Sequence, residues 1–299
     1  MDEKNETKEI VAETRDFNFS AEEINDVRWA LSGISQISSE LMDKVGNDSV
    51  VKEFGIASFF PIVGERIING ETPIIEAINA NTRGRGFKAI FNDGAFITKP
   101  IENNNEPKIA LLMSEMGIGP KQYESLENYI TEEFVEGAAI KDLKPEQCSP
   151  EFMQGLGVKI TEAVERIHSK GILINDQLLS DDFGKSHTIV GSDGGIRFID
   201  FGASVDLNEF PNISDDAVYA IMRSDGMASM MLGMATQDNI GDIINDYRKK
   251  FISEFKTKED VMACYDGQLM SEGLSFLSQR IGGPAVKAMV SGMQSQRSN

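Results

Sequence analysis

Two aspartates, Asp200 and Asp176, are the residues of this sequence whose surroundings best suit chemistry. Asp200 follows a short apolar run at residues 196–199 and opens an Asp-Phe-Gly tripeptide, and Asp176 comes just after a second apolar run at residues 171–174. A carboxylate delivered by a buried strand can chelate a hard cation such as Mg²⁺ or accept the proton of a hydroxyl group. The same tripeptide recurs at residues 182–184 in a predicted loop, so its context must decide which copy matters.

Hydrophobic patterning predicts the elements that would position these aspartates. Strand-like patterns occur in the first half of the chain at residues 58–63, 73–78, 87–91, 95–99 and 129–135. An Asn-Asp-Gly turn at residues 92–94 predicts a hairpin between the third and fourth of these strands. Residues 107–116 have a helical pattern, which the glycines and the proline of residues 116–120 bring to an end.

The second half of the chain is predicted to be mostly helical, with short strand patterns at residues 171–174, 188–190 and 196–199. Near the N-terminus, Ser20 and Glu23 form a capping-box pair that opens an amphipathic helix to about residue 46. We therefore predict an α+β protein in four parts. These are a disordered acidic tail (residues 1–18), an N-terminal helical extension (19–54), a small β-rich lobe (55–135) and a larger helical lobe (136–299).

Composition limits the partners and the location of the protein. The net charge of -19 argues against nucleic acid as a partner, because affinity for the phosphate backbone rests on clustered Lys and Arg. Two cysteines, Cys148 and Cys264, stand in no metal-binding spacing, which favours a reducing compartment. The charged N-terminus differs from a signal peptide, and no apolar run approaches membrane-spanning length. We expect a cytoplasmic protein, of the producing cell or of a host if a non-classical system exports it.

The order of several short motifs resembles the protein-kinase-like superfamily, in particular its compact atypical kinases of the RIO type and the aminoglycoside phosphotransferases. The motifs are Lys99, Glu106, residues 117–120, residues 133–137, residues 167–168, residues 171–176 and residues 199–202. They span roughly residues 74–235, and their order carries the resemblance more than any one of them. The resemblance implies a bilobal kinase-like fold that binds ATP and Mg²⁺, or Mn²⁺ in its place, between a small N-lobe and a larger C-lobe.

By this resemblance, each charged motif residue has a role in phosphoryl transfer. Asp176 would orient the acceptor hydroxyl or accept its proton, and Asp200 would chelate the metal ion. Lys99 would bridge the α- and β-phosphates, and Glu106, at the start of the next helix, would fix the lysine by an ion pair. Glu115 is an alternative partner. A solvated lysine at a strand end and a surface carboxylate near a helix start are the plainer interpretations.

Two further segments would contact the nucleotide. Gly84 and Gly86 lie in residues 79–86, where a glycine-rich loop would let backbone amides approach the phosphates; a plain hairpin loop is the alternative. Residues 133–137 would join the two lobes, and the backbone at Glu133 and Val135 would hold the edge of adenine. An edge strand that ends in a turn is the alternative for this segment.

The catalytic segment departs from the pattern of the superfamily in two ways. Ile174 stands where a histidine usually braces the catalytic loop, so it must brace the loop by packing alone. Asp181 stands where an asparagine is expected to bind a second metal ion. Either Asp181 or Asp182 supplies that oxygen, or an insertion brings His187 to this place, which we favour because residues 188–190 match the strand that follows. Imidazole is a poor ligand for Mg²⁺, so a neighbouring acid would then chelate the ion.

We therefore predict an enzyme, an atypical kinase that transfers the γ-phosphoryl group of ATP to a hydroxyl by positioning and charge neutralisation. A divergent protein Ser/Thr kinase with a protein substrate is favoured, because residues 203–224 are long enough for an activation-type segment, although no Ala-Pro-Glu closes it. A small-molecule kinase of the aminoglycoside or sugar type is the first alternative. A nucleotide-binding pseudokinase that acts as an interaction module is the second, supported by the degenerate glycine loop, Ile174 and the missing asparagine.

Overall fold

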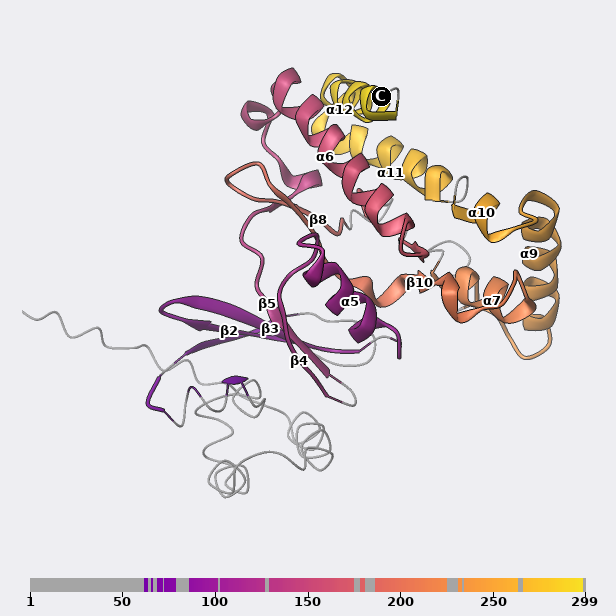
Figure 1. Cartoon of the computed structure of the whole chain (residues 1–299), viewed down its shortest axis with the longest axis horizontal. Coiled ribbons are helices and arrows are strands. Elements are labelled where there is room, and N and C mark those ends of the chain that lie inside the picture. The colour runs from indigo at the N-terminus through magenta and orange to yellow at the C-terminus, as the bar shows by residue number, and fades with distance from the viewer. Residues whose placement is uncertain are drawn as a thin grey trace, which may run out of the picture.

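The computed structural model of the chain describes residues 62–63, 66, 69–71, 73–78, 86–101, 103–126, 129–174, 178–180, 186–224, 231–232, 234–262 and 266–297. The predicted acidic tail and helical extension lie outside these residues. Figure 1 shows a sheet-rich N-terminal lobe, which ends at residue 133, followed by a helical C-terminal lobe, which begins at residue 138. This is the α+β arrangement that the sequence predicts.

An antiparallel sheet of five strands forms most of the N-terminal lobe. In the order in which they pair, the strands are β1 (Ile74–Ile78), β2 (Gly86–Phe91), β3 (Gly94–Pro100), β5 (Tyr129–Glu133) and β4 (Gln122–Leu126). Phe91 pairs with Gly94, so Asn92 and Asp93 form the turn of the predicted hairpin. The strands predicted at residues 73–78, 87–91 and 95–99 are confirmed.

Three details of the N-terminal lobe differ from the sequence prediction. Ile62 and Val63 are helical where a strand was expected, because a short apolar run fits either structure once it is buried. Strand β4 was not predicted, since it lies at the edge of the sheet and exposes Tyr123. Strand β5 ends at Glu133 rather than at residue 135, because the chain leaves the sheet there toward the C-terminal lobe.

Helix α5 (Glu106–Glu115) packs on this sheet. Pro107 lies in its first turn, and Gly117, with φ +67, follows its end, so the helix matches the predicted residues 107–116 to within one residue at each end. Ile109 and Met113 on its inner face are buried in one core with Ile130 of β5. This packing holds the first turn of the helix against the strands.

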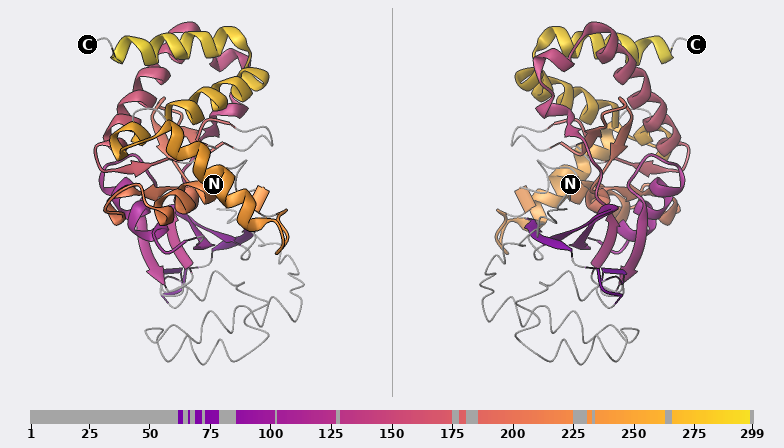
Figure 2. Two further views of the ribbon diagram at one scale, coloured as in Figure 1. Left: turned by 90° about the vertical axis from the view of Figure 1, so that its right-hand side faces the viewer. Right: turned by 90° about the vertical axis from the view of Figure 1, so that its left-hand side faces the viewer.

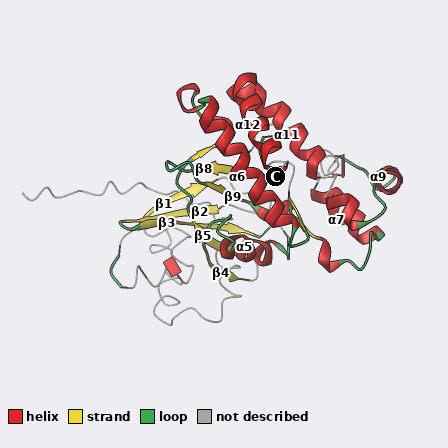
Figure 3. Cartoon of the chain, turned by 45° about the horizontal axis from the view of Figure 1, so that its top comes forward, coloured by secondary structure: helices red, strands yellow, loops and turns green. Residues whose placement is uncertain are grey.

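Helices make up most of the C-terminal lobe (Figure 3). The α-helices are α6 (Pro150–His168), α7 (Asp215–Ser224), α9 (Ile240–Glu254), α10 (Lys258–Asp260), α11 (Asp266–Ile281) and α12 (Gly283–Arg297). Short 3₁₀ turns are η2 (Ile140–Asp142), η3 (Pro145–Gln147), η4 (Phe201–Ala203) and η5 (Leu207–Glu209). Within the described ranges, no helix combines the length and apolar character needed to cross a membrane.

Two small antiparallel sheets carry the segments that the sequence singles out. Strand β7 (Ile172–Leu173) pairs with β10 (Val205–Asp206), and β6 (Ala138–Ala139), β8 (Thr188–Val190) and β9 (Ile196–Phe198) pair in the order β6-β8-β9. The short strands predicted at residues 171–174, 188–190 and 196–199 are therefore confirmed. Strands β6 and β10, with two residues each, were not predicted.

The helices α6 and α12 cross with their backbones in contact, at the end of the molecule away from the five-stranded sheet (Figure 2). A Cβ atom placed on Gly157 of α6 would clash with the carbonyl oxygen of Met289. A Cβ atom on Gly292 of α12 would clash in the same way with the carbonyl oxygen of Gln154. Only glycine leaves room for this crossing, and each of the two helices carries a glycine at the contact.

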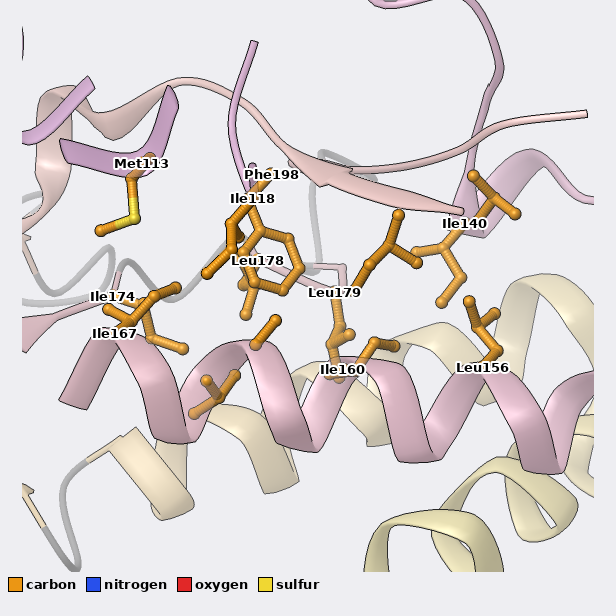
Figure 4. Packing of buried hydrophobic residues seen from close by; sticks show 14 of the residues in the cluster. Met113, Ile118, Ile140, Leu156, Ile160, Ile167, Ile174, Leu178, Leu179 and Phe198 are labelled. Atoms are coloured by element: carbon orange, nitrogen blue, oxygen red, sulfur yellow. The ribbon is translucent and has the colours of Figure 1, made fainter. Parts of the chain in front are cut away.

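One hydrophobic core extends through both lobes (Figure 4). Met113 of α5 and Ile118 meet Phe198 of β9 and Ile167 of α6 within it. A second core cluster packs α7 and α9 against β7 and β10. Because β9 shares its core with α5, the segment that follows β9 is held in a fixed place relative to the N-terminal lobe.

Candidate active site

Lys99 of β3 points into the region between the lobes. Its strand neighbour Thr98 is buried and forms a hydrogen bond with Thr131 of β5 (Oγ1–Oγ1 3.0 Å), so strand alternation turns Lys99 to the other face of the sheet. Lys99 Nζ lies 2.8 Å from Glu106 Oε1 and 2.8 Å from Asp200 Oδ1, and its side chain is 13% exposed. The ion pair expected between Lys99 and Glu106 is present.

Asp200 reaches Lys99 from the C-terminal lobe, two residues after β9. With φ 63 and ψ 74, it is the one non-glycine residue in the described part of the chain that has a positive φ. A residue with a Cβ atom adopts this conformation at a cost, and such strain gathers at functional sites. The surrounding backbone is held in place: Ile199 N–H donates to the carbonyl of His187 (2.9 Å), and Asn103 Nδ2 donates to the carbonyl of Gly202.

His187 lies beside the carboxylate oxygen of Asp200 that Lys99 does not contact. Its Nε2 is 3.5 Å from Asp200 Oδ2, whereas Lys99 contacts Oδ1. The structure thus brings together two of the three residues that the sequence predicts as metal ligands. The Asp200 side chain is 36% exposed, so it is open to a bound ion.

Other predicted site residues cannot be placed beside this cluster. Asp176, Asp181 and Gly84 lie outside the described residues, and their roles stay predictions. Gly86 is the first residue of β2, at the end of the predicted glycine-rich loop. Among the described side chains, no group of three or more His, Cys, Asp and Glu is arranged to hold a metal ion.

The charges around Lys99 determine its protonation. Burial by itself lowers the pKa of the ammonium, but the negative charges of Asp200, Glu106 and Glu132 outweigh it and raise the pKa above its ordinary value. Lys99 is therefore a permanent cation, paired with Glu106 and Asp200 and influenced by the charge of Glu132.

Glu132 is a member of this cluster that the sequence analysis missed. It lies on β5, is 5% exposed, and shares a strand face with Ile130, the residue that pairs with Lys99. Burial raises the pKa of its carboxyl to about 7, with Lys99 lowering it and Glu106 and Asp200 raising it. The available signal was strand alternation, because Glu132 falls on the same side of the predicted strand as the apolar Ile130.

The segment that joins the lobes follows Glu132 directly. Glu133 N–H donates to the carbonyl of Lys121 (2.8 Å), and Phe134 N–H donates to the carbonyl of Ala95 (2.9 Å), so these two amides are used within the N-terminal lobe. Gly137, with φ +156, passes so close to β8 that a Cβ atom there would clash with the carbonyl oxygen of Val190. The predicted base-binding residues Glu133 and Val135 therefore lie in a short connection anchored at both ends.

A second lysine also links the helix α5 to the segment after Asp200. Lys108 Nζ lies 2.7 Å from Asp206 Oδ2 and 3.3 Å from Glu209 Oε1. Asn105, just before α5, donates a hydrogen bond to Glu209 as well. These contacts hold the start of α5, which carries Glu106, against residues 206–209.

The described residues fit a metal-bound polyphosphate. Lys99 supplies a buried permanent cation that complements phosphate charge, and Glu106 holds it in place. Asp200 supplies an exposed carboxylate oxygen, the ligand type that Mg²⁺ prefers, and phosphate oxygens and water complete such a coordination sphere. The arrangement is suited to phosphoryl chemistry, in which positioning and charge neutralisation dominate.

Known proteins are similar to this chain in structure but not in sequence. No protein-family pattern matches the chain, and no curated protein matches it. The structure is similar to a kinase of the Cydia pomonella granulovirus, with 11% identity and a TM-score of 0.34, covering 61% of this chain and 77% of that chain. It is also similar to an ethanolamine kinase of Plasmodium vivax, with 13% identity and a TM-score of 0.35, covering 91% of this chain and 93% of that chain. Similarity at this level does not assign an activity to the chain.

Proposed function

We propose that the protein binds ATP and Mg²⁺ between its lobes and transfers the γ-phosphoryl group to a hydroxyl. The observation that carries this proposal is the contact of Lys99 with both Glu106 and Asp200 at 2.8 Å, with Asp200 in a strained left-handed conformation. A carboxylate from the neighbouring helix and one from a segment about a hundred residues away meet at this cation, and the distant one, Asp200, is the strained residue. Strain of this kind persists where the surrounding structure enforces it, which favours a functional over a merely structural ion pair.

Each residue of the cluster has a role in binding the nucleotide. Lys99 holds the α- and β-phosphates, Glu106 fixes Lys99, and Asp200 holds the metal ion, which neutralises charge on the phosphates. His187 and Asp181 are the candidates for a second contact with the metal, with the acid as the better ligand for Mg²⁺.

Backbone groups are proposed to hold the base and to lie over the phosphates. The carbonyl of Glu133 and the N–H of Val135 are proposed to hold the edge of adenine, since the N–H of Glu133 already donates to Lys121. Gly84 and Gly86 are proposed to let the backbone approach the phosphates.

Asp176 is proposed as the residue that acts on the acceptor. The acceptor oxygen attacks the γ-phosphorus, its proton passes to Asp176, the bond from the γ-phosphorus to the bridging oxygen breaks, and ADP leaves. Ile174, two residues earlier, is buried, which agrees with its expected role of bracing this segment by packing.

The class of hydroxyl acceptor is a separate question. The length of residues 203–224 favoured a protein acceptor, but this stretch folds as β10, η5 and α7, with Val218 and Ile221 buried in the second core cluster. A packed segment is not an extended platform for a polypeptide, so its length no longer favours a protein over a small molecule. Both classes therefore enter the test.

Nucleotide binding is tested by thermal unfolding with and without saturating ATP and Mg²⁺. The wild type is expected to gain several degrees in Tm, because a ligand that binds only the folded state stabilises it. Lys99→Ala and Asp200→Ala are expected to lose this gain, each measured against its own Tm without nucleotide. Lys250→Ala, which removes an exposed lysine of α9, is the matched control and should keep the gain. If both site variants keep it too, the assignment of the cleft is wrong.

Transfer is tested with γ-labelled ATP and Mg²⁺ or Mn²⁺, in separate reactions with cell-extract proteins, aminoglycosides and sugars. Asp176→Ala is expected to keep nucleotide affinity and to lower turnover by about 10²- to 10⁴-fold. Nucleotide binding without transfer to any acceptor and without hydrolysis would instead identify a pseudokinase. Full activity in Asp176→Ala would show that another residue acts on the acceptor.

A further inference from the structure

Glu132 is a buried carboxyl group in the cleft for which the proposed mechanism has no use. Its residue is 5% exposed, and the nearby charged groups are Lys99 from β3, Glu106 from α5 and Asp200 from the segment after β9. Lys99 Nζ is engaged at 2.8 Å with both Glu106 and Asp200. Among the residues that the structure describes, none donates a hydrogen bond to the Glu132 carboxyl.

A carboxyl group in this setting calls for a hydrogen-bond donor. Moving a polar group out of water without a compensating hydrogen bond is costly, and buried polar groups in native proteins are normally paired. The same cost raises the pKa of Glu132 to about 7, because burial disfavours the charged form of the carboxyl group. A ligand that brings an N–H group to this carboxyl would remove the cost.

The position of Glu132 indicates which part of a nucleotide it would meet. In the sheet register, Lys99 pairs with Ile130 and Ile97 pairs with Glu132, so Glu132 lies on the face of Lys99, one alternation further along β5. Glu132 also directly precedes Glu133 and the connection to the C-terminal lobe. A nucleotide with its phosphates at Lys99 and its base against this connection would place the base beside Glu132.

Resting on the proposed function, we propose that Glu132 selects the base of the nucleotide by accepting a hydrogen bond from the exocyclic amino group of adenine. A carboxylate only accepts hydrogen bonds, so it favours an amino group and disfavours a carbonyl oxygen at the same ring position. Inosine triphosphate (ITP) carries such a carbonyl in place of the amino group of ATP. Glutamine has the shape of glutamate but can also donate, so Glu132→Gln removes this selection with little change in volume.

The test measures the dissociation constants of Mg·ATP and Mg·ITP at pH 8 for the wild type, Glu132→Gln and a control. The wild type is expected to prefer ATP by about tenfold or more, the factor that one unpaired buried polar group corresponds to. Glu132→Gln is expected to reduce this preference at least about fivefold. Because inosine also differs in its ring N–H, the change between the two proteins, not the wild-type preference alone, reports on Glu132. Glu136→Gln, at an exposed residue of the same connection, should leave the preference unchanged.

The wild type alone gives a second measurement that needs no variant to fold. At pH 6 the protonated carboxyl can donate to the inosine carbonyl, so the preference for ATP is expected to be smaller than at pH 8. The γ-phosphate titrates alike in both nucleotides and cancels from the ratio. If the preference for ATP is the same in Glu132→Gln as in the wild type, or the same at pH 6 and pH 8, Glu132 does not select the base. The proposed binding of the nucleotide is unaffected by that result. A wild type that binds neither nucleotide overturns the proposed function itself.

Discussion

Two lysines link the N-terminal lobe to the segment that follows β9, and their contacts are nearly the same in length but differ in burial. Lys99 lies 2.8 Å from each of Glu106 and Asp200 with 13% of its side chain exposed. Lys108 lies 2.7 Å from Asp206 and 3.3 Å from Glu209 with 62% of its side chain exposed. We call these sets the buried triad and the surface triad. Contact distance does not distinguish them, so their different consequences must come from the surrounding medium.

Burial makes the charges of the buried triad interdependent. Screening by water is weak around Lys99 and Glu106, which are 13% and 1% exposed, so each strongly changes the free energy of the other. Lys99 keeps its proton because the charges of Asp200, Glu106 and Glu132 outweigh the effect of burial. In the surface triad Lys108 is open to water and salt, and Asp206, although 5% exposed, also accepts hydrogen bonds from Asn208, so the ion pairs of Lys108 contribute little to stability. The comparison suggests that the buried triad is kept for what it binds and the surface triad for the placement of α5.

Removing Lys99 is expected to have the largest effect. Lys99→Ala leaves the carboxylate of Glu106, 1% exposed, without its cation, and should destabilise the protein by about 3–5 kcal/mol. Urea unfolding of Lys99→Ala and of Lys99→Ala with Glu106→Gln measures this. The second substitution removes the stranded charge and should restore most of the loss. A loss below about 1 kcal/mol would place Lys99 in the same class as Lys108.

Glu132→Gln is expected to change the pH dependence of stability. The pKa of Glu132 is about 7 in the folded protein against 4.5 for an ordinary glutamate, so between these values the folded state holds a proton that the unfolded state has lost. This group therefore costs stability as pH rises through that window, by up to about 1.4 kcal/mol per pH unit. The free energy of unfolding of Glu132→Gln minus that of the wild type should rise from pH 4.5 to pH 7 and level off above. A flat difference would contradict the burial of the carboxyl.

The two aspartates of the triads are expected to respond oppositely to glycine and alanine. Asp200 has φ 63, where alanine is strained, so Asp200→Gly should be more stable than Asp200→Ala by about 1 kcal/mol. Asp206 has φ -86, which alanine adopts without strain, and glycine loses more conformational entropy on folding. Asp206→Ala should therefore be more stable than Asp206→Gly. Chemical denaturation of the four variants decides this, and the same order at both positions would argue against strain at Asp200.

Salt should reveal the smallest effect. Lys108→Ala is expected to cost under about 1 kcal/mol at low ionic strength and less in 1 M salt, because the ammonium is 62% exposed and the buried Asp206 keeps its hydrogen bonds from Asn208. The loss in Lys99→Ala should persist in the same salt. If the two losses decline in parallel, burial does not separate the triads.

Much of the buried triad could be predicted from the sequence, because Lys99, Glu106 and Asp200 each stand at the boundary of a strand or helix whose pattern is clear. Glu132 was missed because a charged residue inside a strand is usually solvent-facing, although its alternation with the buried Ile130 placed it on the inner face. The surface triad was missed because Asp206 and Glu209 lie in a segment without periodicity. Asp176, Asp181 and Gly84 remain predictions, since they lie outside the described residues.

The crossing of α6 and α12 has a consequence for the order of folding. Gly157 and Gly292 bring together two helices that are far apart in the chain, so α6 has no partner for its glycine face while it emerges from the ribosome. The C-terminal lobe therefore cannot complete its packing until residues 283–297 have been made. Until then the newly made α6 has an exposed apolar surface, which is the kind of surface that chaperones bind.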